Sequence, residues 1–498
     1  MEEKYRRFYE SLGYTGPALP SELEASVVTN EGGPGVLEEV AEGLPEVPAP
    51  QEDWAEVPPL GPEGIDELEE MLNTRPEETL AKAREVFDER ISEAELRANI
   101  ARARMALRSP ELAVAVRETE SALFEVSNQL PPGFTFEGMD LNEIDIKPGD
   151  IKFETVADWA GWLFLAGPFV LTKGPRDKFR WHNGAASRFV YDLEEPTAAA
   201  PLEVALFSDF GTGRYHSQYI AKQLRVRKFP YAFHLGDVYY AGRRSEFRDF
   251  FAAPLDPILA DTRLFALNSN HEMYSAGKPY YEFMDRRRNA HPEKQQQEGS
   301  YFCLRSSRFQ IVGIDTAYFG HGRFEEQALR DWLTQTLREG KNAGRVNVLL
   351  SADHPYNYGS EGHSDLLQKD LAGPAINDRL VDLWFWGNTH YCALFDRDAS
   401  SPFIGSCIGH GGYPYDRQAT GKNRPAPLLF LETAPRFPGW TELRQDRGNN
   451  GYCVMSLRAD GSVGLRYVDW MARVRCEAAL SRTAGNRLEV ASVEEKPF

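Results

Sequence analysis

The sequence has few cysteines and no long apolar run. Its five cysteines in 498 residues are odd in number and show no Cys-x-x-Cys spacing, so neither a disulfide framework nor a thiolate zinc site is expected. The most apolar stretch, residues 159–171, is broken by Gly167 and Pro168 and is too short to span a bilayer. The first residues contain no apolar core of a secretory signal. These absences predict a reduced, cytoplasmic protein without a membrane span.

Basic residues are absent from a long N-terminal segment. No lysine or arginine lies between Arg7 and Arg75, whereas 16 aspartates and glutamates do. This interval accounts for 16 of the 19 net negative charges, so the remainder of the chain is close to neutral. A near-neutral body argues against a protein that coats nucleic acid. Local arginine clusters could still attract a small anionic substrate.

The character of the sequence changes several times along the chain. An acidic segment rich in Pro and Gly predicts an arm that cannot fold alone and that could cover a site or bind a partner. Helix start signals at Pro76 and at Ser92 with Glu95 then predict a helical bundle, either structural or partner-binding. Later, apolar runs alternate with helical patterns, which predicts a layered α/β domain. The predicted divisions are 1–62 (arm), 63–130 (helical bundle), 131–200 (connecting segment), 201–470 (catalytic domain) and 471–498 (C-terminal tail).

Two helices and a hairpin are predicted within the α/β region. Residues 246–260 and 323–340 have helical patterns and follow apolar runs, which is typical of strand-to-helix units. Residues 452–470 contain two apolar stretches separated by Asp460 and Gly461, which predicts a β-hairpin with its turn at these two residues.

Five short apolar runs end on polar residues that can bind a metal. Each run is rich in Val, Ile, Leu and Phe, which predicts a strand buried on both faces. Because ligands collect at the carboxyl ends of such strands, we expect one shared site. Oxygen and imidazole donors without thiolate suit Zn, Mn, Fe or Mg. The runs end at Asp209 (VALFSD), Asp237 (AFHLGD), Asn270 (LFALNSN), His354 (VLLSADH) and His390 (LWFWGNTH).

With their neighbours these residues form five motifs: DFG at 209–211, GDVYY at 236–240, SNHE at 269–272, DHP at 353–355 and GNTH at 387–390. In this order they resemble the signatures of the calcineurin-like metallophosphoesterases, and the tyrosine after GD makes the purple acid phosphatase branch the nearer likeness. The resemblance covers about residues 201–470. It implies a sandwich of two mixed β-sheets flanked by helices, here with an N-terminal helical accessory region.

The resemblance also implies a role for each residue. Asp209, Tyr240 and His390 would hold a first metal, expected to be iron, and Asp237 would bridge to a second, which Asn270 and His354 would hold. The neighbouring Tyr239 is the less favoured phenol and could pack in the core. His271 would assist the leaving group as an imidazolium. His363, nine residues beyond His354, could contact substrate.

Two motifs depart from the family pattern. Ser269 stands where glycine is usual, which could restrict the turn. Asn388 stands where a second histidine would bind the second metal, and an amide oxygen binds such a metal more weakly than imidazole. The second site, for Zn, Mn, Fe or Mg, is therefore expected to be weaker or biased toward harder ions such as Mn or Mg. Alternatively, Asn388 could point away and leave the position to water. His234 is expected in the core, whereas His321 and His410 lie in Gly-rich loops and could line the pocket.

Three functions follow from this pattern. The first is hydrolysis of a small phosphorylated substrate by in-line attack of a hydroxide held between two metals, as a phosphatase or phosphodiesterase. The second is a nuclease of the same fold, which the missing basic surface disfavours. The third is a non-catalytic regulatory protein with a degraded metal site, which Asn388 favours.

Overall fold

The computed structural model describes residues 176–496, except 186–187, 256–260, 293, 361 and 437–446, together with short helical stretches between residues 69 and 101. Among these residues, no helix is both long and apolar enough to cross a membrane. The predicted arm and most of the predicted helical bundle and connecting segment lie outside the described residues.

Eight strands form one mixed sheet. Their order is β1 (Val190–Asp192), β5 (Phe302–Arg305), β6 (Phe309–Ile314), β7 (Val346–Ser351), β8 (Leu383–Trp386), β10 (Ile404–Ile408), β9 (Cys392–Phe395) and β11 (Leu428–Leu431). The central strands β6, β7 and β8 are parallel neighbours. Every residue of β7 and β8 is buried, as their uninterrupted apolar sequences predict.

Seven strands form a second mixed sheet. Their order is β15 (Leu488–Glu495), β14 (Val474–Arg482), β13 (Val463–Asp469), β12 (Gly451–Leu457), β2 (Leu202–Phe207), β3 (Tyr231–His234) and β4 (Arg263–Ala266). Strands β2, β3 and β4 are parallel neighbours, and β12 to β15 are antiparallel. The predicted hairpin is confirmed as β12 and β13, and Gly461 in its turn has a φ of 85°, a conformation that glycine adopts readily.

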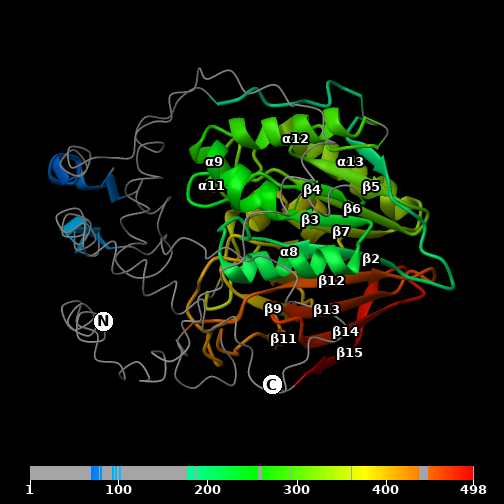
Figure 1. Ribbon diagram of the computed structural model, residues 1–498. Coiled ribbons are helices and arrows are strands. Elements are labelled where there is room, and N and C mark those ends of the chain that lie inside the picture. The colour runs from blue at the N-terminus through cyan, green and yellow to red at the C-terminus, as the bar shows by residue number, and fades with distance from the viewer. Residues whose placement is uncertain are drawn as a thin grey trace, which may run out of the picture.

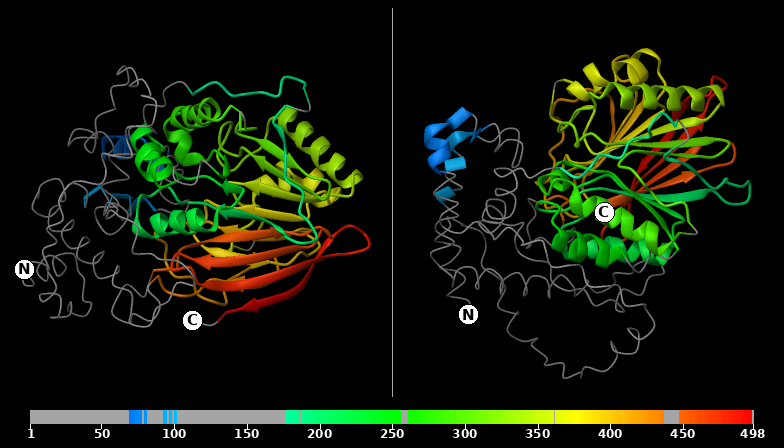
Figure 2. Two further views of the ribbon diagram at one scale, coloured as in Figure 1. Left: turned by 45° about the vertical axis from the view of Figure 1, so that its right-hand side comes forward. Right: turned by 90° about the horizontal axis from the view of Figure 1, so that it is seen from above.

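The two sheets pack face to face. Phe233 of β3 and Phe302 of β5 stack with ring centroids 6.2 Å apart, and the hydroxyls of Ser406 in β10 and Tyr467 in β13 lie 2.8 Å apart. Figure 1 shows this arrangement, and the right view of Figure 2 shows the strands between two layers of helices. The predicted sandwich of two mixed sheets flanked by helices is therefore confirmed.

Helices cover the outer face of each sheet. Helix α13 (Gln327–Asn342) packs on the eight-stranded sheet, where the amide of Asn347 in β7 donates to the carbonyl of Leu337 at 2.7 Å. Its Gly340 permits this approach, because a Cβ there would lie 2.2 Å from Asn347 Oδ1. Helix α8 (Tyr215–Arg227) packs on the other sheet, where Gln223 donates to the carbonyl of Trp470 at 2.8 Å.

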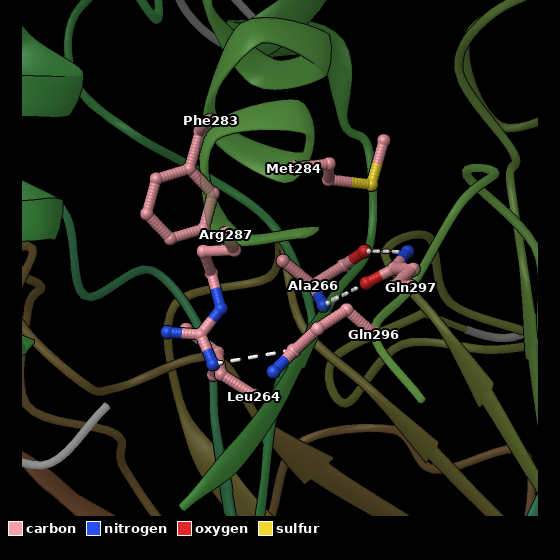
Figure 3. A pocket seen from close by; sticks show the side chains of 7 residues that line it. All are labelled: Leu264, Ala266, Phe283, Met284, Arg287, Gln296 and Gln297. Atoms are coloured by element: carbon pink, nitrogen blue, oxygen red, sulfur yellow. Dashed lines mark hydrogen bonds between the residues drawn. The ribbon is translucent and has the colours of Figure 1, made fainter. Parts of the chain in front are cut away.

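The remaining described helical elements lie in the connections. They are α9 (Arg244–Glu246), η5 (Phe247–Ala252), α11 (Asn270–Tyr274), α12 (Lys278–Ala290), η6 (Leu366–Asp370) and η7 (Ala372–Asn377). A small cavity lies between α12 and β4, lined by Leu264, Ala266, Phe283, Met284, Arg287, Gln296 and Gln297 (Figure 3). None of its lining residues is a candidate site residue, so we regard it as part of the core.

The sheets extend beyond both predicted ends of the catalytic domain. Strand β1 lies in the predicted connecting segment and pairs with β5. Strands β14 and β15 lie in the predicted C-terminal tail and complete the edge of the seven-stranded sheet. Among the described residues, the two hydrogen-bonded sheets therefore extend from β1 to β15.

Candidate metal centre

The five strand ends come from different sheets. Strands β2, β3 and β4 end together in the seven-stranded sheet, and β7 and β8 end together in the eight-stranded sheet. The backbone amide of Asn388, after β8, donates a 3.0 Å hydrogen bond to Asp209 Oδ2, after β2. The carboxyl ends of both sets of strands thus meet at one place.

Three of the candidate residues have an uncommon backbone conformation. The φ angles of Asp209, Asp237 and Asn388 are 57°, 79° and 57°. Non-glycine residues rarely adopt this left-handed region, although Asp and Asn tolerate it best. Such strain is concentrated at functional sites. Here it turns the chain sharply as each strand ends.

Two buried carboxylates and a histidine form the centre of the site. One side-chain ligand atom each of Asp209, Asp237 and His390 lies within 4.8 Å of those of the other two. Both aspartates have no exposed surface, whereas the His390 side chain is 29% exposed, and its Nε2 atom lies 3.1 Å from Asp209 Oδ1. Oxygen and imidazole donors at this spacing suit a divalent or trivalent ion.

A tyrosine hydroxyl completes this group, and it belongs to Tyr239. The hydroxyl lies 2.7 Å from Asp209 Oδ1, 2.9 Å from Asp237 Oδ2 and 2.9 Å from His390 Nε2. Tyr240, which the motif spacing favours, is also fully buried, and its backbone amide donates to Glu246 Oε1 at 2.6 Å. The structure thus places the phenol of Tyr239 among the three ligand candidates.

The second set of predicted ligands lies at the next strand ends. Asn270 begins α11, where its Nδ2 donates to the Tyr274 hydroxyl at 3.0 Å. Its Oδ1 is buried and accepts no hydrogen bond from the residues that the structure describes. His354 is half-buried after β7. The side-chain amide of Asn388 donates to Asp353 Oδ1 at 2.9 Å.

His271 lies beside Asp237 and is almost entirely buried. Its Nδ1 is 2.6 Å from the carbonyl oxygen of Tyr240 and donates to it, which leaves Nε2 on the side of Asp237, 3.9 Å from Oδ2. Burial lowers the pKa of His271 to about 3, and the hydrogen bond to Tyr240 opposes this shift only in part. A pKa of about 3 corresponds to a neutral imidazole, and the imidazolium role that the resemblance implies stays a prediction.

The charge of the centre favours a cation. Burial, with the negative charges of Asp209 and Glu272, raises the pKa of Asp237 well above its ordinary value. Burial also acts to raise the pKa of Asp209, but the hydrogen bond and charge of His390 outweigh it, so the net shift is downward. Adjacent buried carboxylates are costly without a compensating cation. With the unsatisfied Asn270 Oδ1, these residues fit a metal.

The sequence has a family match that agrees with this geometry. Residues 202–392 match the model of the calcineurin-like phosphoesterases, and the match spans all five strand-end motifs. Over these residues the chain therefore resembles a calcineurin-like phosphoesterase domain. The described sheets of the phosphoesterase domain continue beyond the match, to β1 on one side and β15 on the other.

Solved structures show a partial likeness in fold. GAP50, the anchor in the inner membrane complex of Plasmodium, is 13% identical in sequence and has a TM-score of 0.40. The alignment covers 59% of this chain and 88% of the GAP50 chain. A purple acid phosphatase from yellow lupin (Lupinus luteus) seeds is 15% identical and has a TM-score of 0.39, and the alignment covers 57% of this chain and 54% of that chain. A dimetal phosphatase from Danio rerio is 12% identical, with a TM-score of 0.37 and coverages of 55% and 98%. These likenesses are too weak to transfer a function, and no curated protein matches the sequence significantly.

The structure does not connect His363 to the centre of the phosphoesterase domain. Its Nε2 lies 3.4 Å from the Ser400 hydroxyl, in the β9–β10 connection, and its ring packs edge-on against Tyr356. Burial lowers its pKa. Among the described residues, no contact joins His363 to the carboxylates or to His390, so its contact with substrate stays a prediction.

Sequence reasoning missed two side chains that support Asp237. The Ser269 hydroxyl lies between Asp237 Oδ1 and Glu272 Oε2, and the backbone amide of Asp237 lies 3.1 Å from the same hydroxyl. Glu272 also accepts from the backbone amide of Ser269 at 3.1 Å. Ser269 and Glu272 form a capping box at α11. Their Ser-x-x-Glu spacing is the sequence signal from which this capping box could be predicted. Ser269 thus contacts Asp237, a candidate metal ligand, through both its side chain and the Asp237 backbone amide.

Proposed function

We propose that this chain hydrolyses phosphate esters at a centre of two metal ions in its phosphoesterase domain. The observation that carries the proposal is the convergence of Asp209, Asp237 and His390, with all three ligand atoms within 4.8 Å. A bound cation explains two fully buried carboxylates in this arrangement, because adjacent buried negative charges are costly without one.

The donor set divides into two groups around Asp237. Asp209, His390 and the Tyr239 phenol would hold the first ion, and Asp237 would be shared. Asn270, through its unsatisfied Oδ1, and His354 would hold the second. A phenol donor favours iron at the first position, while amide and imidazole donors suit Zn, Mn, Fe or Mg at the second. When bound, such a pair supplies an activated water and neutralises the phosphoryl oxygens.

His271 is the residue that we assign to proton transfer. Its Nδ1–H is held by the Tyr240 carbonyl, so its Nε2 faces the side of Asp237, where a substrate would lie. A phosphate anion beside the ring would favour the charged form, which allows Nε2 to carry a proton to the leaving oxygen. Orientation by a backbone carbonyl and exclusion of water prepare the ring for this task.

The substrate class that we propose is a small phosphorylated molecule. The site lies at strand ends, where connecting loops define specificity, and the sequence lacks an extended basic surface for nucleic acid. Phosphatase and phosphodiesterase activities both fit the same centre.

Metal analysis together with activity tests this function. The full chain is stripped with a chelator, reloaded with Fe, Zn, Mn or Mg, and assayed with p-nitrophenyl phosphate and bis-p-nitrophenyl phosphate. We expect bound transition metal and hydrolysis of at least one of the two esters. Bound metal without hydrolysis of either would support a regulatory protein instead, and absence of bound metal after every loading would overturn the proposal.

A further inference from the structure

Asn388, the residue that departs most from the family pattern, forms a hydrogen bond with the side chain of Asp353. Asn388 Nδ2 donates a 2.9 Å hydrogen bond to Asp353 Oδ1, and its backbone amide donates to Asp209. The Asn388 amide is therefore held by a buried carboxylate that is only 3% exposed. This arrangement turns its nitrogen toward Asp353 and leaves only the amide oxygen as a donor, which binds such a metal more weakly than imidazole.

A histidine from a sixth strand end lies on the same carboxylate. The Nδ1 atom of His321 is 3.4 Å from Asp353 Oδ1, and the His321 side chain is 30% exposed, close to the 29% of His390. Among the described residues, none forms a hydrogen bond with this buried Nδ1. A slight rotation of the ring would bring Nδ1–H into hydrogen-bond range of Asp353.

The topology explains why His321 lies there. It belongs to the connection between β6 and α13, and β6 is the parallel neighbour of β7, whose end carries Asp353 and His354. The carboxyl ends of β6, β7 and β8 therefore lie in a row. Thr316, just after β6, donates to Asp353 Oδ2 at 2.6 Å, so this connection contacts both oxygens of that carboxylate.

The connection is anchored on both sides of His321. Asp315 Oδ1 accepts the backbone amides of Ala317 and Tyr318, each at 2.9 Å. On the other side, Arg323 forms a bidentate ion pair with Asp370, from Nε to Oδ2 at 2.9 Å and from Nη2 to Oδ1 at 3.1 Å. Because both ends are held, His321 is fixed in position at little further entropic cost on binding an ion.

We propose that His321 provides the imidazole that Asn388 lacks and binds the second metal ion through Nε2, with Asp353 as its orienting partner. A carboxylate that accepts Nδ1–H fixes the tautomer whose Nε2 has a free lone pair, which is the usual second partner of a metal-binding histidine. The inference rests on the proposed function, since it concerns the second ion of that centre.

Metal binding to the full chain tests this assignment separately from activity. Metal-free protein is dialysed against graded Mn²⁺, bound metal per chain is measured by elemental analysis, and magnetic coupling between paired ions is followed by electron paramagnetic resonance. The variants are His321→Ala and His321→Gln, with His291→Ala as the matched histidine control. Asn388→Ala tests whether Asn388, rather than His321, binds the second ion. Circular dichroism verifies that each variant is folded, and two substitutions at His321 guard against a single misfolded variant.

We expect two ions and a coupled signal in the wild type and in His291→Ala. In both His321 variants, one ion should remain tightly bound, the second should bind at least about tenfold more weakly, and the coupling should be lost. Asn388→Ala should change the second affinity less than His321→Ala. Adding Asn388→His to His321→Ala should restore the second ion, because it returns an imidazole to the family position.

Retention of both ions at wild-type affinity in the His321 variants would overturn the inference and leave the proposed function intact. This includes the case in which only inhibition by inorganic phosphate weakens, which would make His321 an anion contact. A wild type that binds none of Fe, Zn, Mn or Mg would instead overturn the proposed function, and the inference with it.

Discussion

The hydroxyl of Tyr239 donates a 2.7 Å hydrogen bond to Asp209 Oδ1. This contact places a phenol at the candidate first metal position, one residue earlier than the motif spacing predicts. Burial and the charges of Asp209 and Asp237 raise the pKa of Tyr239 well above its ordinary value. A phenolate at this position therefore requires a cation beside it.

The two tyrosines can be separated by spectroscopy. After loading with ferric iron, a phenolate ligand produces a visible charge-transfer band because it is a hard anionic donor on a hard cation. We expect Tyr239→Phe to lose this band and Tyr240→Phe to keep it, as measured by absorption of the purified variants at equal iron content. Loss of the band in Tyr240→Phe alone would return the assignment to the motif position.

Asp237 and His271 should differ in what they do for the site. Asp237→Ala removes the shared carboxylate, so we expect loss of paired metal and of hydrolysis. His271→Ala leaves the ligands in place, so metal content should stay at the wild-type level while kcat falls by about 10²- to 10⁴-fold, the usual size of a general-acid contribution. Elemental analysis beside steady-state kinetics makes the comparison. Equal metal loss in the two variants would contradict these roles.

Ser269 should support metal binding without touching the ion. Its hydroxyl lies between Asp237 and Glu272, so Ser269→Ala leaves two buried carboxylates without that partner. We expect about tenfold or more weaker metal binding and a loss of about 1–3 kcal/mol in the free energy of unfolding. Isothermal titration with Mn²⁺ and urea unfolding measure the two effects. Ser481→Ala, at an exposed position in β14, is the control and should change neither.

His234 should make the domain sensitive to acid. Its side chain is 1% exposed and packs against Phe251 with ring centroids 4.6 Å apart, and burial lowers its pKa to about 3 from 6.5. A folded pKa below the unfolded value means that this contribution is complete above pH 6.5 and is lost as the pH falls toward 3. Each pH unit in that window costs up to about 1.4 kcal/mol.

Replacement of His234 by leucine isolates this effect. Urea unfolding of wild type and His234→Leu is compared at pH 7.5 and pH 5.5, with chelator present so that metal loss does not contribute. The variant should gain about 1.4 kcal/mol over wild type on going to the lower pH, and His291→Leu should not. If the difference in the free energy of unfolding between wild type and His234→Leu is the same at both pH values, His234 takes up a proton in the folded state as readily as in the unfolded state.

Much of the site could be read from the sequence because strand ends are local features. The apolar runs before Asp209, Asp237 and His390 were predicted as buried strands, and the structure has β2, β3 and β8 at those positions. Their period and composition depend only on neighbouring residues. The choice of Tyr239 over Tyr240 is different, because the direction of a side chain depends on the backbone around it and on what surrounds it.

The sequence by itself determined the class of chemistry: oxygen and imidazole donors at the ends of buried strands, with one motif altered at Asn388. It also determined the core role of His234, which the structure confirms at 1% exposure. Only the tertiary structure decided that these strands divide between two sheets, that Ser269 holds Asp237, and that His321 lies against Asp353. Those relationships join residues far apart in the chain, and packing between two sheets sets them, which no local pattern encodes.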